Sequence, residues 1–138
     1  MLLRRLLSLL VNQRLAYIRL RRNAMTVRDA YTGRELSALA KTPFTTRRLL
    51  VGDFVAAEAC LRDLLRQLYG RSFGFAPPFG VVHPIEMIED GLAPVEYRLL
   101  QELGEGAGCR SVCVHVGAEL SNERVIEVAR SHSGGIGA

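Results

Sequence analysis

The segment from Leu49 to Val116 limits the fold of this chain most narrowly, because helical and strand patterns alternate along it. A long amphipathic run with helical spacing is followed by a short apolar run, and the same pair then occurs a second time. Strands separated by helical crossovers pair in parallel, with the helices packed on the faces of the sheet. The segment therefore predicts an α/β domain built on a sheet that is at least partly parallel.

The two helices of this segment have recognisable ends. Asp53 suits the N-cap of a helix over 53–69, and Gly70 is a natural C-terminal stop. Pro94 suits the first position of the second helix. Glycines are expected to end that helix: Gly104, Gly106 and Gly108. Apolar residues at helical spacing predict the buried face of the first helix: Phe54, Ala57, Leu61, Leu64, Leu65 and Leu68.

Apolar runs predict five strands. The unbroken run at 79–83 suits a central strand covered on both faces, and residues 110–116 form the next strand. Residues 15–40 read as three antiparallel strands joined by two tight turns. A short helix at 122–131 and a flexible tail at 132–138 follow. The expected fold is a mixed five-stranded sheet, a three-strand meander plus two parallel strands, with helices on both faces.

Composition indicates one folded domain in a reducing compartment. With 138 residues and 49% hydrophobic content, the chain can bury a core. Its net charge of +4 permits an anionic partner without requiring one. Three cysteines, an odd count, and the lack of a secretory signal favour the cytoplasm. Cys109 and Cys113 would lie on one face of a strand but more than about 10 Å apart, too far for one zinc ion, so we expect no metal or cofactor.

Residues 1–12 are expected to form an amphipathic helix. Apolar side chains fill one arc of this helix, and Arg4 and Arg5 lie on the other. One interpretation docks it on the core of this protein or on a second subunit. The other lays it on the inner face of the cytoplasmic membrane, with arginines at the lipid head groups. The membrane interpretation assigns lipid binding to Leu2, Leu3, Arg4, Arg5, Leu6, Leu7, Leu9 and Leu10.

Three meander strands followed by two βα crossovers resemble the ribonuclease H-like fold, and several phrases resemble MreB, the bacterial actin. The phrase VGDFVAAEACLRDLLRQLYG resembles a helix of that family, and a strand ending His83-Pro84 follows it in the family's order. Val95–Arg98 and Gly106–Val112 resemble two further family motifs, and the leader MLLRRLLSLL resembles its membrane-binding helix. The resemblance covers about half the chain. It implies one actin-like domain, 13–131, in a protein of bacterial cell shape or the cytoskeleton.

The sequence departs from this family at the nucleotide site. Actin-like proteins hold phosphates with a loop of Asp-x-Gly-Thr character between the first two strands. Here that hairpin, Ile18–Asn23, has no glycine, threonine or acid. Glu96 aligns with the glutamate that positions the attacking water in the family. We interpret it as an acid favoured by the dipole of a helix N-terminus, a remnant of the catalytic position rather than a catalytic residue.

Two other activities fit the sequence less well. A ribonuclease H-type nuclease needs several carboxylates around two metal ions, whereas the strand at 15–20 has none and Asp29 stands alone. Nucleic acid is an unlikely partner for the first hairpin, because aromatic residues for base stacking are few. The arginines of that hairpin region are Arg14, Arg19, Arg21, Arg22 and Arg28. The histidines His83, His115 and His132 have no partners that would make a nucleophilic site.

The leading hypothesis is a non-enzymatic, MreB-like scaffolding or interaction protein that associates with a protein partner or with copies of itself. Its surfaces would be the leader helix, the sheet edge, and apolar faces that a second actin-like half normally covers. Two alternatives stay open. One is an ATPase completed by a partner chain that supplies the phosphate loops, and the other is a nucleic-acid-binding module that uses the arginine-rich hairpin.

Overall fold

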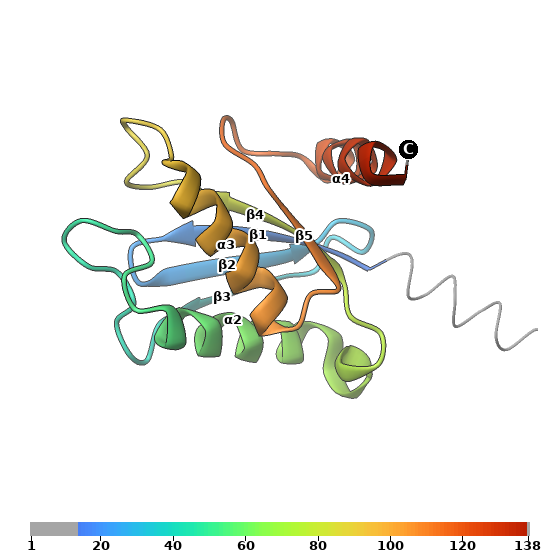
Figure 1. Ribbon diagram of the computed structural model, residues 1–138. Coiled ribbons are helices and arrows are strands. Elements are labelled where there is room, and N and C mark those ends of the chain that lie inside the picture. Colours follow the sequence, from blue (N-terminus) through green and yellow to red (C-terminus); the bar gives the residue numbers. More distant parts are fainter. Residues whose placement is uncertain (1–13, 138) are drawn as a thin grey trace, which may run out of the picture.

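The structure is a computed structural model that describes residues 14–137 (Figure 1). The predicted leader helix and its membrane-binding residues lie outside this range. The described elements are β1 (Leu15–Arg21), β2 (Ala24–Asp29), β3 (Glu35–Leu39), α2 (Phe54–Tyr69), the short 3-10 helix η1 (Gly70–Gly74), β4 (Phe79–Pro84), α3 (Pro94–Ala107), β5 (Ser111–Val114) and α4 (Asn122–Gly137).

The five strands form one mixed sheet in the order β3-β2-β1-β4-β5. Strand β2 pairs antiparallel with both β1 and β3, whereas β4 pairs parallel with both β1 and β5. Ile18 of β1 lies opposite Val27 on one side and Val82 on the other. The predicted α/β class, with a three-strand meander and two parallel strands, is therefore confirmed.

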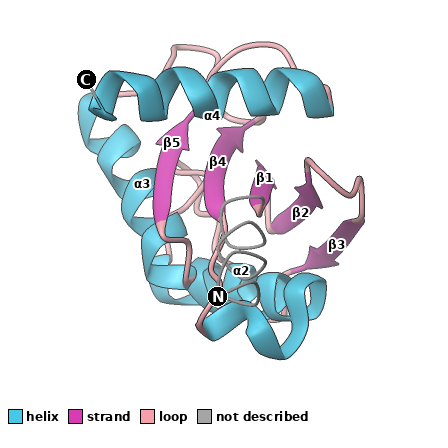
Figure 2. Ribbon diagram, turned by 90° about the vertical axis from the view of Figure 1, so that its right-hand side faces the viewer, coloured by secondary structure: helices cyan, strands magenta, loops and turns pink. Residues whose placement is uncertain are grey.

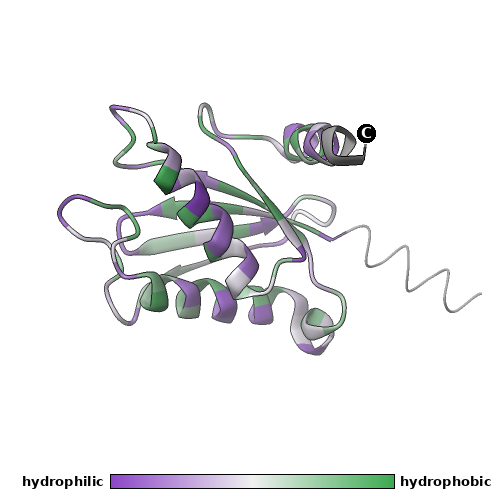
Figure 3. Cartoon of the chain, viewed as in Figure 1, coloured by the Kyte–Doolittle hydropathy of each residue, from purple (hydrophilic) through white to green (hydrophobic). Residues whose placement is uncertain are grey.

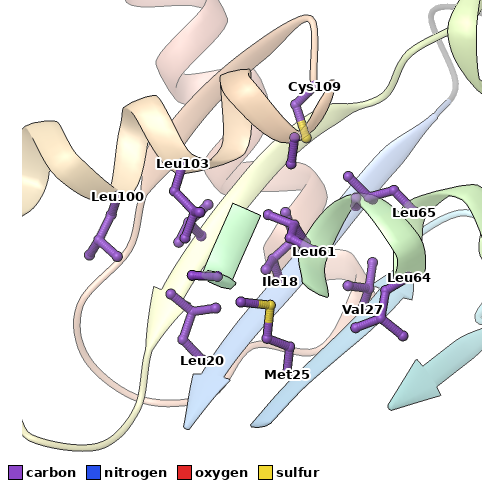
Figure 4. Close-up of a cluster of buried hydrophobic side chains, with 14 of the residues drawn as sticks. Ile18, Leu20, Met25, Val27, Leu61, Leu64, Leu65, Leu100, Leu103 and Cys109 are labelled. Atoms are coloured by element: carbon purple, nitrogen blue, oxygen red, sulfur yellow. The ribbon is translucent and has the colours of Figure 1, made fainter. Parts of the chain in front are cut away.

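Helices cover both faces of the sheet, as expected from the apolar pattern of the strands. Helices α2 and α3 lie on one face, and α4 lies on the other (Figure 2). Hydrophobic and hydrophilic residues alternate around α2 (Figure 3), because only one side of this helix meets the sheet. Ile18, Leu61 and Leu103 belong to the larger core, under α2 and α3 (Figure 4). Leu15 and Tyr17 belong to the smaller core, under α4.

The ends of α2 are those the sequence predicts. Asp53 accepts a hydrogen bond from Ala56 N at 3.0 Å, which satisfies one of the free N–H groups of the first turn. Gly70 follows the helix with φ of 70°, a conformation that glycine adopts without a steric penalty. The apolar face of α2 then lies against one face of β2 and β3.

Helix α3 does not end where the glycines predicted. Gly104 and Gly106 lie inside the helix, and only Gly108, with φ of 122°, follows its end. A Cβ atom on Gly104 would lie 2.6 Å from Cγ2 of Val112 on β5. Gly104 therefore allows α3 to pack closely on the sheet, and this glycine does not mark the end of the helix.

The last helix differs from the prediction. Helix α4 extends through Gly137, into the segment predicted to be a flexible tail. Within residues 14–137, no helix is long and apolar enough to cross a membrane.

Replacing Gly104 with alanine should destabilise the protein by about 1–3 kcal/mol, because the stiff side chain of Val112 cannot yield to the added methyl group. Chemical denaturation measures this. Gly74→Ala is the control, since a Cβ atom there meets nothing within 4 Å. Adding Val112→Ala to Gly104→Ala should cost less than Val112→Ala costs in the wild type. Equal stability of wild type and Gly104→Ala would contradict the close packing.

Candidate functional site

Glu96, the residue that the sequence resemblance aligns with a catalytic glutamate, caps its own helix. Its carboxylate accepts a hydrogen bond from Ala93 N at 3.1 Å, in the first turn of α3. The cavity beside it holds only about 20 Å³, lined mostly by apolar residues such as Leu49, Met87 and Leu99. This volume suffices for about one water molecule. The contacts of Glu96 fit a role in stabilising the helix.

The turn between β1 and β2 is tied to the rest of the chain. Asn23, with φ of 53°, accepts hydrogen bonds from Phe44 N and Thr45 N, both at 2.8 Å. Arg22 forms an ion pair with Glu86 at 3.1 Å. The turn therefore holds the connector after β3 in place. The backbone of the turn bonds to protein groups, whereas the backbone of a phosphate loop would bond to a nucleotide.

The other predicted site residues do not gather into one place. Asp29, the acid considered for a nuclease, is buried and accepts hydrogen bonds from Tyr69 Oη at 2.6 Å and from two backbone N–H groups. Arg14 lies at the start of β1 and Arg21 at its end, so the arginines of the first hairpin form no single cluster. Among the described residues, no group of histidine, cysteine and acidic side chains has the arrangement of a metal site.

The cysteines are free, and the two of the C-x3-C pair lie on opposite faces of the sheet. Cys109 lies in the core under α2 and α3, whereas Cys113 lies in the core under α4. This corrects the prediction that they share a face, because Cys109 precedes β5 and does not follow the alternation of the strand. Burial raises the pKa of Cys109 to about 12 and that of Cys113 to about 11, so both thiols stay protonated and unreactive at neutral pH.

A buried polar network lies under the N-terminal end of α4, and sequence reasoning missed it. Tyr17 Oη donates to His83 Nδ1 at 2.6 Å, and the N–H of Leu120 donates to Tyr17 Oη at 3.1 Å. Nε2 of His83 lies 3.0 Å from the carbonyl oxygen of Gly117. Since a carbonyl only accepts, Nε2 carries the proton and Nδ1 accepts from Tyr17. Burial lowers the pKa of His83, which keeps the ring neutral.

This network has a structural role. It includes two main-chain groups, the acceptor Gly117 O and the donor Leu120 N. Both belong to the connection between β5 and α4. Arg28 donates to Leu120 O at 2.7 Å and to Asn122 Oδ1 at 2.6 Å, and so holds the start of α4 as well. The one signal in the sequence was a tyrosine inside an apolar strand, since a buried tyrosine hydroxyl needs a partner.

The exposed edge of the sheet offers a different kind of site. Strand β3 is the last strand of the sheet on its side and pairs only with β2. A groove of about 250 Å³ runs between β3 and α2. Small or apolar residues line much of this groove: Ala38, Leu39, Ala56, Ala59, Cys60 and Leu64. Leu39 is 82% exposed and Val55 is 76% exposed. Unpaired backbone beside exposed apolar side chains is suited to strand pairing with another chain.

A comparison with known proteins identifies a relative of this chain. The chain is 45% identical over 96 residues to the uncharacterized protein YjaA of Escherichia coli (strain K12), and the match covers 66% of this chain and 74% of YjaA. The chain belongs to the YjaA family. No family model matches it. Because the name YjaA states no activity, a function for members of this family has to be argued from the structure.

The buried neutral His83 should make stability depend on pH. Its pKa is lower in the folded protein than in the unfolded chain, where it is about 6.5, so the unfolded chain binds more protons between the two values. The free energy of unfolding should therefore fall as the pH drops through this window. His83→Gln keeps a donor and an acceptor but cannot titrate, and should reduce that slope in urea titrations between pH 7 and pH 5. His132→Gln is the control. Identical slopes for wild type and His83→Gln would contradict the assignment.

Proposed function

We propose that this YjaA-family protein is a non-enzymatic interaction protein of MreB-like, ribonuclease H-like fold that works by self-association. The strand order β3-β2-β1-β4-β5, with two antiparallel and two parallel pairings, supports the finer fold assignment. By resemblance, its setting is bacterial cell shape or the cytoskeleton. The observation that carries the association is the exposed edge of β3 beside the groove on α2.

A second copy of this chain is the occupant that fits the β3 edge. Antiparallel pairing of β3 with itself about a two-fold axis at Ala38 places Ser37 opposite Leu39 of the second copy. The same register places the acidic residue Glu35 opposite Lys41, so the two ends of the paired strands carry opposite charges. The small residues Ala56 and Ala59 on the flank of α2 leave room for the second copy to approach.

A substitution at Leu39 should break the dimer. Burial of a leucine side chain contributes about 2 kcal/mol, and a two-fold dimer buries Leu39 of both copies, so Leu39→Lys should raise the dimer dissociation constant by roughly 1,000-fold. Light scattering after gel filtration, over a range of concentrations, measures the change. Val95→Lys is the matched control, since Val95 is 72% exposed on α3, away from β3. A wild-type protein that stays monomeric would sink the proposal, and equal weakening by both variants would place the interface elsewhere.

We also propose that the chain alone does not hydrolyse ATP. Two contacts support this: the turn after β1 is bound to Thr45 and Glu86, and Glu96 is engaged at the start of its helix. Isothermal calorimetry with Mg-ATP should show no binding heat for the pure chain. A measured ATPase activity that Glu96→Gln abolishes would establish the enzyme instead.

The membrane part of the proposal rests on the leader. In the helix that the sequence predicts for residues 2–11, Leu2, Leu6 and Leu9 would lie on the apolar arc, and Arg4 and Arg5 on the polar one. We propose that this segment holds the protein at the inner face of the cytoplasmic membrane. A segment of this pattern binds lipid by apolar burial and by attraction to anionic head groups.

A further inference from the structure

The end of the sheet at which β1, β4 and β5 begin is rich in arginine. The basic face is defined here by five arginines from separate parts of the chain: Arg14, Arg34, Arg71, Arg110 and Arg130. Two adjoining hollows shape it, and Figure 2 looks toward this end of the sheet. One hollow, of about 110 Å³, is lined by Arg14, Arg110 and Arg130, and the other, of about 330 Å³, by Arg14 and Arg34. Tyr31 lines both hollows.

The positive charge of the basic face is not neutralised within the described residues. None of the ion pairs formed by residues 14–137 includes one of its five arginines. Asp29 is the one carboxylate that lines either hollow, and it is buried and hydrogen-bonded to Tyr69. Arg34, Arg71, Arg110 and Arg130 are exposed to solvent. An anionic surface would therefore meet several guanidinium groups at once.

Exposed aromatic side chains lie beside these arginines. Phe75 is 72% exposed and Tyr31 is 45% exposed. Arg14 fixes the segment that carries Phe75, since it donates to Ala76 O at 2.7 Å and to Ser72 Oγ at 2.5 Å. Aromatic rings and arginines together suit the interface of a membrane, where the ring enters the head-group region and the guanidinium group contacts phosphate.

We propose that the basic face binds the anionic head groups of a membrane and acts together with residues 2–11. This inference rests on the proposed membrane association. Residues 1–13 precede Arg14 directly, so a lipid-bound leader joins the domain at this face. A short apolar anchor alone binds membranes weakly, and a second, basic contact makes the attachment stable. The leucines of the leader favour lipid over nucleic acid, because aliphatic side chains neither stack on bases nor contact phosphate.

Charge reversal at the basic face tests this. Arg110→Glu with Arg130→Glu lowers the net charge from +4 to 0, since each change subtracts two charges. Arg47→Glu with Arg48→Glu makes the same change in the loop before Leu49, toward the other end of the sheet. Binding is measured by flotation with phosphatidylcholine vesicles, with and without phosphatidylglycerol. The first variant should lose at least about tenfold in affinity for the anionic vesicles, and the second should lose much less.

Further arms separate the basic face from the leader. Phe75→Ser, which leaves the charge unchanged, should also weaken binding, and thermal melting of each variant verifies that it folds. If deleting residues 1–11 weakens binding but charge reversal at the basic face does not, the inference is wrong and the leader proposal stands. If the full chain binds no vesicle, both are wrong. If charge reversal abolishes binding of a DNA or RNA oligonucleotide and leaves vesicle binding unchanged, the face binds nucleic acid.

Discussion

The double burial of β1 is the constraint on which the rest of the structure depends. This strand lies in the middle of the sheet and presents Leu15 and Tyr17 to one core and Ala16 and Ile18 to the other. The first four residues of β1 are buried and Tyr17 is among them, so the hydroxyl group of Tyr17 must be satisfied internally. His83 and Leu120 do this, and the same bonds fix the connection that places α4 over the second face.

The position of α4 also decides which apolar surfaces of the domain stay exposed. Because α4 covers the second face of β1 and β4, the exposed apolar residues lie at the margins of the domain. Leu39 lies at the β3 edge, and Phe75 lies at the end where β1 begins. The turn at the opposite end of β1 is held by Asn23 and Arg22. Binding surfaces at the margins, rather than a central cleft, are what a small closed domain of this kind offers.

The sequence predicts the order of elements well because that information is local. Apolar spacing, an N-cap such as Asp53 and a stop such as Gly70 lie within a few residues of what they determine. The sequence wrongly predicts a helix end at Gly104. A glycine is needed there because a methyl group of Val112, on the neighbouring strand, leaves no room for a side chain. The pairing of Tyr17 with His83 joins residues 66 positions apart. The arginines of the basic face likewise come from five separate places along the chain, so no sequence motif predicts this face.

The two proposed contacts are linked by the geometry of strand pairing. Antiparallel pairing reverses the strand direction across the two-fold axis, so β1 of the second copy begins at the opposite end of the joined sheet. The two basic faces of the dimer then point in opposite directions along the strands. A flat bilayer meets one of these faces, and the other stays free for a second membrane surface or a further anionic partner. If both proposed contacts form, the dimer would link two anionic surfaces rather than lie flat on one.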